Sequence, residues 1–123
     1  MKQFNYQKGK LGEEAAKNYL IKKGYKILES NFSTRFGEID LIALKNKVLI
    51  FVEVKAKEGE NFGLPEEMIN SHKIFQIKRM AEVYLQQNQD LAAKYPLWRL
   101  DAVCLVYNAE GEIDRINHYE SLE

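Results

Sequence analysis

The chain has 123 residues, of which 46% are hydrophobic and 29% charged, a composition that fits one domain (residues 1–123) with a real core. It has no apolar run of about 18 residues, and its first residues lack the apolar core of a secretion signal. We therefore expect no membrane span and a cytoplasmic location. Cys104 is the only cysteine, which excludes an intrachain disulfide and a cysteine-based zinc cluster.

The net charge is zero, so the overall charge does not by itself indicate nucleic-acid binding. The charges are unevenly distributed, because residues 1–35 hold eight Lys and Arg against three Glu. This basic N-terminal third can form a local face that attracts phosphate. The alternative is that these lysines are ordinary surface residues of a helix.

Residues 8–23 are predicted to form the first helix, which Gly24 ends. Its apolar arc consists of Leu11, Ala15, Ala16, Tyr19 and Leu20. At about 100° per residue, Glu13 lies on the border of this arc and Glu14 points away from it. We expect Glu13 to face the sheet, where an acid needs a partner. The alternative is an exposed pair between Glu13 and Lys17.

Residues 25–32 are predicted to form a strand, and residues 37–57 two further strands joined by a tight turn at Asn46-Lys47. In that hairpin one face is apolar at every position: Ile39, Leu41, Ala43, Val48, Ile50, Val52 and Val54. A slip of one residue would exchange the two faces, so the alternation favours strands in this register.

The same register brings charged residues together at the end away from the turn. Asp40 is expected directly opposite Glu53, and Glu38 directly opposite Lys55. Directly opposed residues in an antiparallel pair have Cβ atoms about 4.5–5.5 Å apart. Two carboxylates and a lysine should therefore converge on one face of the sheet.

A second long helix is expected to begin between Pro65 and Ser71, where Ser71 is a candidate N-cap, and to end near Gln87. Residues 98–107 and 113–119 should form the last two strands, joined by a turn. The order αβββαββ predicts an α/β domain with one mixed β-sheet flanked by helices.

The converging side chains suit a divalent metal. Mg²⁺ prefers oxygen ligands, usually one or two carboxylates together with waters and substrate phosphate. Asp40 and Glu53 would supply the carboxylates, and the Val54 carbonyl a third oxygen. Lys55 would orient an attacking water or stabilise charge developing on a phosphate. The alternative is a cross-strand ion-pair cluster of Glu38, Asp40, Glu53 and Lys55 with only a structural effect.

Further residues are candidates for nucleic-acid contact. Asn70, Lys73 and Gln76 recur at three-residue spacing along the second helix, and the alternative is that they form a solvated face. Arg35 and Lys57 flank the hairpin and are positioned to follow a phosphate backbone.

Other polar residues are expected to lie outside the site. Arg99 and Asp101, two residues apart on the fourth strand, should pair locally. His72 and His118 have no companion at metal-ligand spacing, and we expect both to be incidental. The chain has no GxxxxGK[ST], GxGxxG or HExxH motif.

Nearly the whole chain resembles a known family. GKLGEEAAKNYLIKKGYKILESNF, FGEIDLIAL, FVEVKAK and Arg99-Leu100-Asp101 are similar to the YraN-like family of uncharacterised bacterial proteins. The order of elements and acids in turn resembles the PD-(D/E)XK nuclease superfamily, with archaeal Holliday-junction resolvases closest in style. Ile39 stands before Asp40, at the position of the motif proline.

This resemblance implies a restriction-endonuclease-like fold and a nuclease that requires Mg²⁺ or possibly Mn²⁺. Its catalytic residues would be Glu13, Asp40, Glu53 and Lys55, and its metal ligands Glu13, Asp40, Glu53 and Val54. The implied substrate is DNA rather than RNA, with branched or damaged structures as candidates, and a homodimer is a candidate assembly. The alternatives are a non-catalytic nucleic-acid-binding module and a protein-interaction domain.

Overall fold

The computed structural model describes the backbone of residues 2–122 and the side chains of residues 10–122. Five strands form one mixed sheet in the order β1-β2-β3-β4-β5. β3 and β4 pair in parallel, and the other neighbouring strands pair antiparallel. The elements in chain order are α1 (Lys2–Lys22), β1 (Lys26–Thr34), β2 (Gly37–Lys45), β3 (Val48–Glu58), the 3-10 helix η1 (Pro65–Met68), α2 (Ser71–Gln87), α3 (Gln89–Lys94), β4 (Leu97–Tyr107) and β5 (Ile113–Tyr119).

The predicted α/β class and the order αβββαββ are confirmed for the main elements, with η1 and α3 added. Both additions are too short to give a helical periodicity in the sequence. The predicted cap of α2 is wrong, because Asn70 rather than Ser71 is the N-cap. The Asn70 Oδ1 accepts a hydrogen bond of 2.9 Å from the Lys73 backbone N–H.

The hairpin register is confirmed from Leu41–Val52 to Lys45–Val48. Asn46 and Lys47 both have positive φ, 50° and 63°, as a two-residue type I′ turn requires. The expected pairs of Asp40 with Glu53 and of Glu38 with Lys55 are not part of this ladder, which ends at Leu41–Val52.

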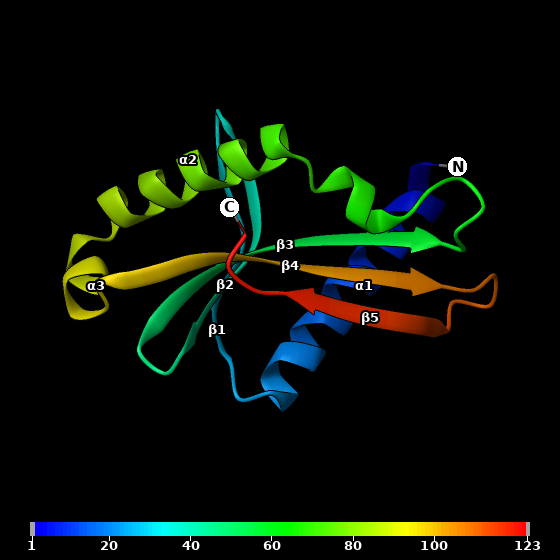
Figure 1. Ribbon diagram of the computed structural model, residues 1–123, viewed down its shortest axis with the longest axis horizontal. Helices are drawn as coiled ribbons and strands as arrows, with labels where there is room; N and C mark the ends of the chain where they lie inside the picture. Colours follow the sequence, from blue (N-terminus) through cyan, green and yellow to red (C-terminus); the bar gives the residue numbers. More distant parts are fainter. Residues whose placement is uncertain (1, 123) are drawn as a thin grey trace.

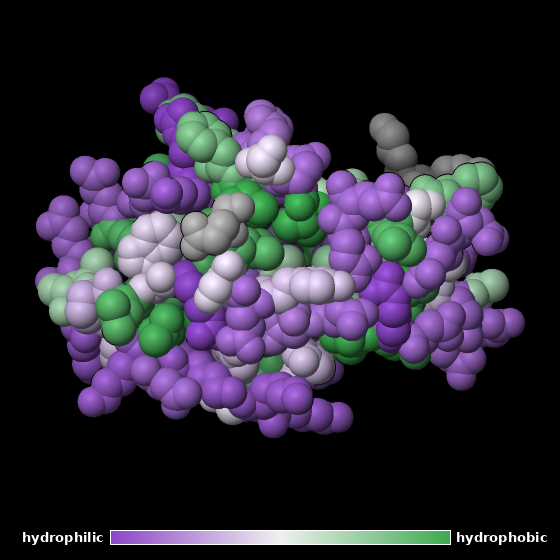
Figure 2. Space-filling view, in the orientation of Figure 1, coloured by the Kyte–Doolittle hydropathy of each residue, from purple (hydrophilic) through white to green (hydrophobic). Residues whose placement is uncertain are grey.

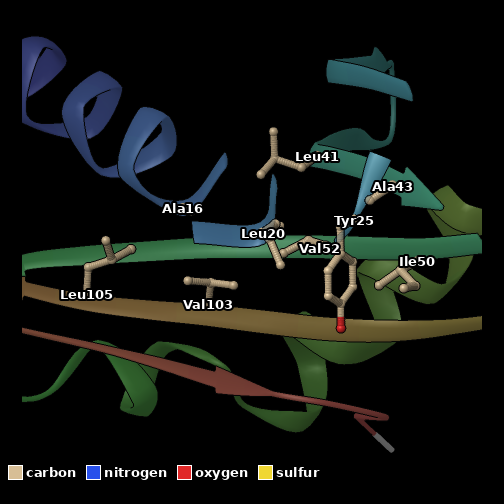
Figure 3. Close-up of a cluster of buried hydrophobic side chains, with 9 residues drawn as sticks. All are labelled: Ala16, Leu20, Tyr25, Leu41, Ala43, Ile50, Val52, Val103 and Leu105. Atoms are coloured by element: carbon tan, nitrogen blue, oxygen red, sulfur yellow. The ribbon is translucent and has the colours of Figure 1, made fainter. Parts of the chain in front are cut away.

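α1 packs on one face of the sheet through a core cluster shown in Figure 3. Its members are Ala16, Leu20, Tyr25, Leu41, Ala43, Ile50, Val52, Val103 and Leu105. Leu11 does not belong to the apolar arc of the helix, since it is 57% exposed. No helix in the described part of the chain is both long and apolar enough to cross a membrane.

α2 covers the opposite face of the sheet (Figure 1). The second cluster consists of Ile39, Ile42, Leu49, Phe51, Ile77, Met80, Ala81, Tyr84 and Leu100. Ile39 was expected on the same face as Leu41, but it packs under α2 whereas Leu41 packs under α1. Residues two apart on a regular strand share a face, so β2 is irregular between these two residues, at Asp40.

Candidate functional site

Asp40 lies at this irregular point of β2. The β1–β2 ladder pairs Ser30 with Leu41 and Phe32 with Ile39 but skips Asn31 and Asp40. The Asp40 carboxylate instead accepts a hydrogen bond of 2.7 Å from the Val54 backbone N–H of β3. A side-chain oxygen thus takes the place of a backbone partner where the β2–β3 ladder ends.

Glu53 meets Asp40 although the two are not a ladder pair. The two carboxyl groups lie close enough together that the Glu53 charge helps to raise the pKa of Asp40. Glu53 is only 2% exposed, and β3 positions it beside Asp40 because Val54 is the residue that Asp40 holds. The convergence of these two acids, predicted from the hairpin, is therefore present with a different local geometry.

Two lysines neutralise Glu53. The Lys73 Nζ of α2 lies 3.0 Å from the Glu53 Oε2, and the Lys55 Nζ lies 3.7 Å from the same oxygen. Lys55 was predicted to lie at the site, whereas Lys73 was predicted only as a candidate for nucleic-acid contact along the second helix. The docking of α2 on the sheet, which no local pattern reveals, brings Lys73 to the carboxylates.

Glu13 reaches the same region from α1. A Cβ added to Gly12 would lie 2.7 Å from the Ala56 Cβ, so the helix approaches β3 as closely as it does only because residue 12 is glycine. Glu13 accepts a hydrogen bond of 3.0 Å from the Asn31 Nδ2. The expected inward direction of Glu13 is thus confirmed, and Lys17 pairs with Glu14 instead, at 3.6 Å.

Asn31 is a site residue that the sequence reasoning missed. It has a φ of 55°, a conformation that asparagine tolerates better than most side chains. This conformation coincides with the point where β1 and β2 lose their pairing. An asparagine inside an otherwise regular strand pattern was the available signal.

A solvent-open hollow of about 710 Å³ lies between α1 and the β2–β3 hairpin. The charged residues that line it include Lys10, Glu13, Lys17, Glu38, Asp40 and Lys55. Both Asp40 and Lys55 also contact the buried Glu53. Glu53 is therefore buried, whereas the partly buried Asp40 beside it lines a solvent-open space large enough for a substrate group.

Burial raises the pKa of the Asp40 carboxyl to about 8, with the neighbouring Glu53 charge adding to the effect. The Val54 N–H favours the ionised form but does not outweigh these causes, and Glu13 raises the pKa further. The protein alone therefore keeps Asp40 protonated at neutral pH. A cation at this place would reverse the balance.

The residues fit a divalent metal with few protein ligands. Asp40 and Glu53 supply adjacent carboxylates, and Val54 lines the hollow beside them. Among the described side chains, no three His, Cys, Asp or Glu residues are grouped as a metal-binding set. Glu13, held by Asn31, is thus not grouped with the pair. A Mg²⁺ ion here would complete its shell with waters and substrate oxygens.

The other predicted nucleic-acid residues are dispersed. The Lys57 Nζ donates to the Phe62 carbonyl at 3.4 Å, and Asn70 is used as the cap of α2. Gln76 is exposed on α2, one turn beyond Lys73. Arg35 lies 4.8 Å from the centroid of the Phe36 ring in the β1–β2 turn. Of the five residues, Lys73 alone has a described contact with the carboxylates.

Arg99 and Asp101 form the expected local pair, with Nε to Oδ1 at 3.0 Å. The prediction that His118 is incidental is wrong, because its Nε2 lies 2.7 Å from the Asp101 Oδ2. The edges of Tyr19 and Tyr25 enclose the His118 ring. The sequence hid this contact because it depends on how β5 folds back on β4.

Comparison with known proteins gives one consistent result. The sequence model described as uncharacterised protein family UPF0102 matches residues 12–105, well over half of the chain. A UPF0102 protein of Pelotomaculum thermopropionicum is 38% identical over 113 residues, covering 92% of each chain. The UPF0102 protein TTE1452 of Caldanaerobacter subterraneus is 43% identical over 111 residues, covering 89% of this chain and 88% of the relative.

Proposed function

The chain belongs to the uncharacterised protein family UPF0102, and we propose that it is a metal-dependent nuclease that hydrolyses phosphodiester bonds in DNA. We also propose that its sheet and α1 form a restriction-endonuclease-like fold, in keeping with the resemblance of its motifs to the PD-(D/E)XK superfamily. Mg²⁺ is the proposed cofactor, and Mn²⁺ is a candidate substitute.

The close approach of the Asp40 and Glu53 carboxyls carries this proposal. Two adjacent carboxyls repel each other when both are ionised, which favours a proton on one of them or a cation between them. Here the pair adjoins an open hollow. The described lysine contacts are to Glu53, and an added cation would satisfy Asp40 as well, which favours a metal site over a purely structural pair.

The residues divide the work between binding and positioning. Asp40, Glu53 and the Val54 carbonyl would hold the ion, which would supply positive charge to a phosphate and acidity to a water. The Lys55 side chain is 27% exposed, and its ammonium would donate a hydrogen bond to the attacking water or to a phosphate oxygen. Glu13 would orient a second water from the side of α1.

Lys73 would balance the charge of Glu53 and fix its orientation. Its ammonium is held at 3.0 Å and comes from a capped first turn of α2, so its position is well defined. Release of the Asp40 proton would then accompany metal binding.

A cleavage assay tests the proposal on duplex, single-stranded, flapped and four-way DNA and on RNA, each with Mg²⁺, Mn²⁺ or chelator. Glu53→Gln and Asp40→Asn keep the shape of the side chains but remove a ligand charge. Loss of several kcal/mol of charge stabilisation corresponds to at least about a 100-fold fall in rate. Glu82→Gln, an exposed acid on α2, is the matched control and should cut like the wild type.

Equal cutting by Glu53→Gln and the wild type would overturn the proposal and indicate a contaminating nuclease. No cutting of any substrate by the folded wild type would instead favour a nucleic-acid-binding module. Binding by such a module would weaken with salt and survive the loss of Asp40.

A further inference from the structure

The turn between β1 and β2 projects beside α2 and carries an exposed aromatic ring. Figure 1 shows this tip next to the helix, and Figure 2 shows an apolar patch over it with polar side chains around it. The ring is Phe36, which is 49% exposed. We call the set Arg35, Phe36, Phe75 and Arg79 the tip surface.

The tip surface has a fixed structure. The Thr34 hydroxyl donates to the Met80 Sδ at 3.1 Å and accepts a bond of 3.0 Å from the Phe36 backbone N–H. A Cβ on Gly37 would reach the Met80 side chain at 4.0 Å. The turn is therefore docked on α2, and Phe36 is held outward by a packed base.

Two guanidinium groups flank the Phe36 ring. The Arg35 Cζ lies 4.8 Å and the Arg79 Cζ 5.5 Å from the ring centroid. Phe75, 58% exposed, is four residues before Arg79 and thus its neighbour on the helix surface. Aromatic rings interleaved with arginines form a surface on which bases stack while the guanidiniums contact phosphates.

The tip surface is connected to the carboxylate site by both elements. Along α2, Lys73, Gln76 and Arg79 follow at successive turns, and the rise from Lys73 to Arg79 is about 9 Å. Asp40 comes four positions after Phe36, at the start of β2, which is at most about 13 Å of extended chain. A DNA strand with a phosphate at Asp40 would bring a neighbouring nucleotide to Phe36.

We propose that the tip surface binds an unpaired DNA base, stacked on Phe36, next to the phosphodiester held at the carboxylates. This inference rests on the proposed function and defines its substrate as DNA with unpaired nucleotides, at a flap or a junction. A fully paired duplex keeps its bases stacked on one another and offers no ring to Phe36. Arg35 and Arg79 would contact the phosphates on either side of the unpaired nucleotide.

Fluorescence anisotropy in chelator, where cleavage is stopped, measures binding of single-stranded, flapped and fully paired DNA. Phe36→Ala should weaken binding of single-stranded and flapped DNA by roughly 5- to 150-fold, the range for loss of one stacked base. Binding of the paired duplex should change little. Phe36→Tyr keeps a ring and should bind like the wild type, whereas Phe36→Leu should bind like Phe36→Ala.

Phe62→Ala is the matched control, because this residue is 95% exposed and lies in the loop after β3. It should not change binding. Arg79→Ala is a second variant. It should also weaken binding of single-stranded and flapped DNA, and the binding that remains should depend more on the Phe36 ring. Wild-type affinity in Phe36→Ala or Phe36→Leu overturns the proposal, as does failure of the wild type to bind any of the DNAs.

Cleavage measured with Mg²⁺ separates this inference from the nuclease proposal. If Phe36→Ala loses flap binding but no protein cuts, the tip surface stands and the nuclease fails. If the wild type cuts flapped and paired DNA equally well and Phe36→Ala cuts both at the wild-type rate, the nuclease stands and the tip surface is wrong.

Discussion

Two acids on the sheet, Asp101 on β4 and Asp40 on β2, have opposite surroundings. Asp101 on β4 is fully buried and accepts hydrogen bonds from Arg99, His118 and the Ser121 backbone N–H. Burial raises the pKa of its carboxyl, but the bonds from His118, Arg99 and Ser121 outweigh burial and place the pKa below its ordinary value. Hydrogen-bond donors of the chain itself therefore stabilise the ionised form of Asp101.

Asp40 on β2 has a single described hydrogen-bond donor from the backbone, the Val54 N–H, and a second carboxyl beside it. Its pKa rises to about 8, chiefly because it is buried and secondly because Glu53 is close. The chain therefore leaves Asp40 short of positive charge, and it does so next to an open hollow.

The difference distinguishes a structural acid from a candidate ligand. Burying a charge is costly unless it is paired and hydrogen-bonded. Asp101 meets that condition and ties the C-terminal residues to β4, where the Leu122 N–H also bonds the Leu100 carbonyl at 2.7 Å. The Asp40 carboxylate lacks such a charge partner, and a cation from solution would supply one.

The largest expected effect is on stability at Asp101. Asp101→Asn should lower the free energy of unfolding by about 3–5 kcal/mol, because it removes the buried anion shared by Arg99 and His118 and leaves Arg99 only Glu120. Asp40→Asn should lower it far less at pH 7, since the folded protein already holds Asp40 neutral. Urea unfolding of both variants measures the contrast, and equal losses would remove the distinction between the two acids.

A smaller loss of stability is expected when His118, a hydrogen-bond partner of Asp101, is replaced. His118→Gln should cost about 1.5–3 kcal/mol, the range for a hydrogen bond to a charged group. His72→Gln, an exposed residue of α2, is the matched control and should be near neutral. An unchanged stability in His118→Gln would show that Arg99 and Ser121 alone satisfy Asp101.

The pH dependence of stability should differ in sign between the two acids. Without metal, unfolded Asp40 ionises near pH 3.8 and folded Asp40 only near pH 8, so the folded state binds more protons in between. Stability should therefore fall as pH rises from about 4 to about 8, by more than ~1.4 kcal/mol, the value of one pKa unit.

Asp40→Asn should reduce this fall in stability with rising pH. If the fall persisted in the variant, it would contradict the raised pKa of Asp40. Asp101 acts oppositely, because its folded pKa is lowered below 3.8. Its contribution is present above about pH 4 and is lost as pH falls through the folded value. Urea midpoints across this range in chelator, for the wild type and Asp40→Asn, separate the two windows.

The smallest effect concerns metal. Mg²⁺ at about ten times its dissociation constant stabilises the folded state by about 1.4 kcal/mol, which should raise the melting temperature of the wild type by roughly 5 °C. Asp40→Asn should show no such rise, whereas Glu82→Gln should show it in full. An equal rise in all three proteins would place the ion elsewhere.

The hairpin was predictable because its information is local. Alternating apolar residues fixed the faces, and a two-residue turn fixed the register from Leu41–Val52 onward. The four residues Glu13, Asp40, Glu53 and Lys55 all lie around the hollow or contact a residue that lines it. The alternation of apolar and polar residues in the hairpin and the angular position of Glu13 on its helix were enough to predict that these residues lie together.

Other features depend on how distant elements dock. Lys73 reaches Glu53 only because α2 lies across the sheet, and His118 reaches Asp101 only because β5 returns beside β4. The break in pairing at Asn31 and Asp40 is a local backbone event that alternation cannot register. The break in pairing at Asp40 and the docking of Lys73 turn the expected ladder pair into two close carboxyls beside a hollow.

The most direct test of this account is a carbon-detected NMR titration of the Asp40 carboxyl, with and without Mg²⁺. The account predicts a pKa near 8 in the free protein, because Asp40 is buried beside Glu53, and a large fall when Mg²⁺ is added. Titration near the ordinary value of 3.8 with no response to the ion would contradict it. Asp40 would then be, like Asp101, a structural acid.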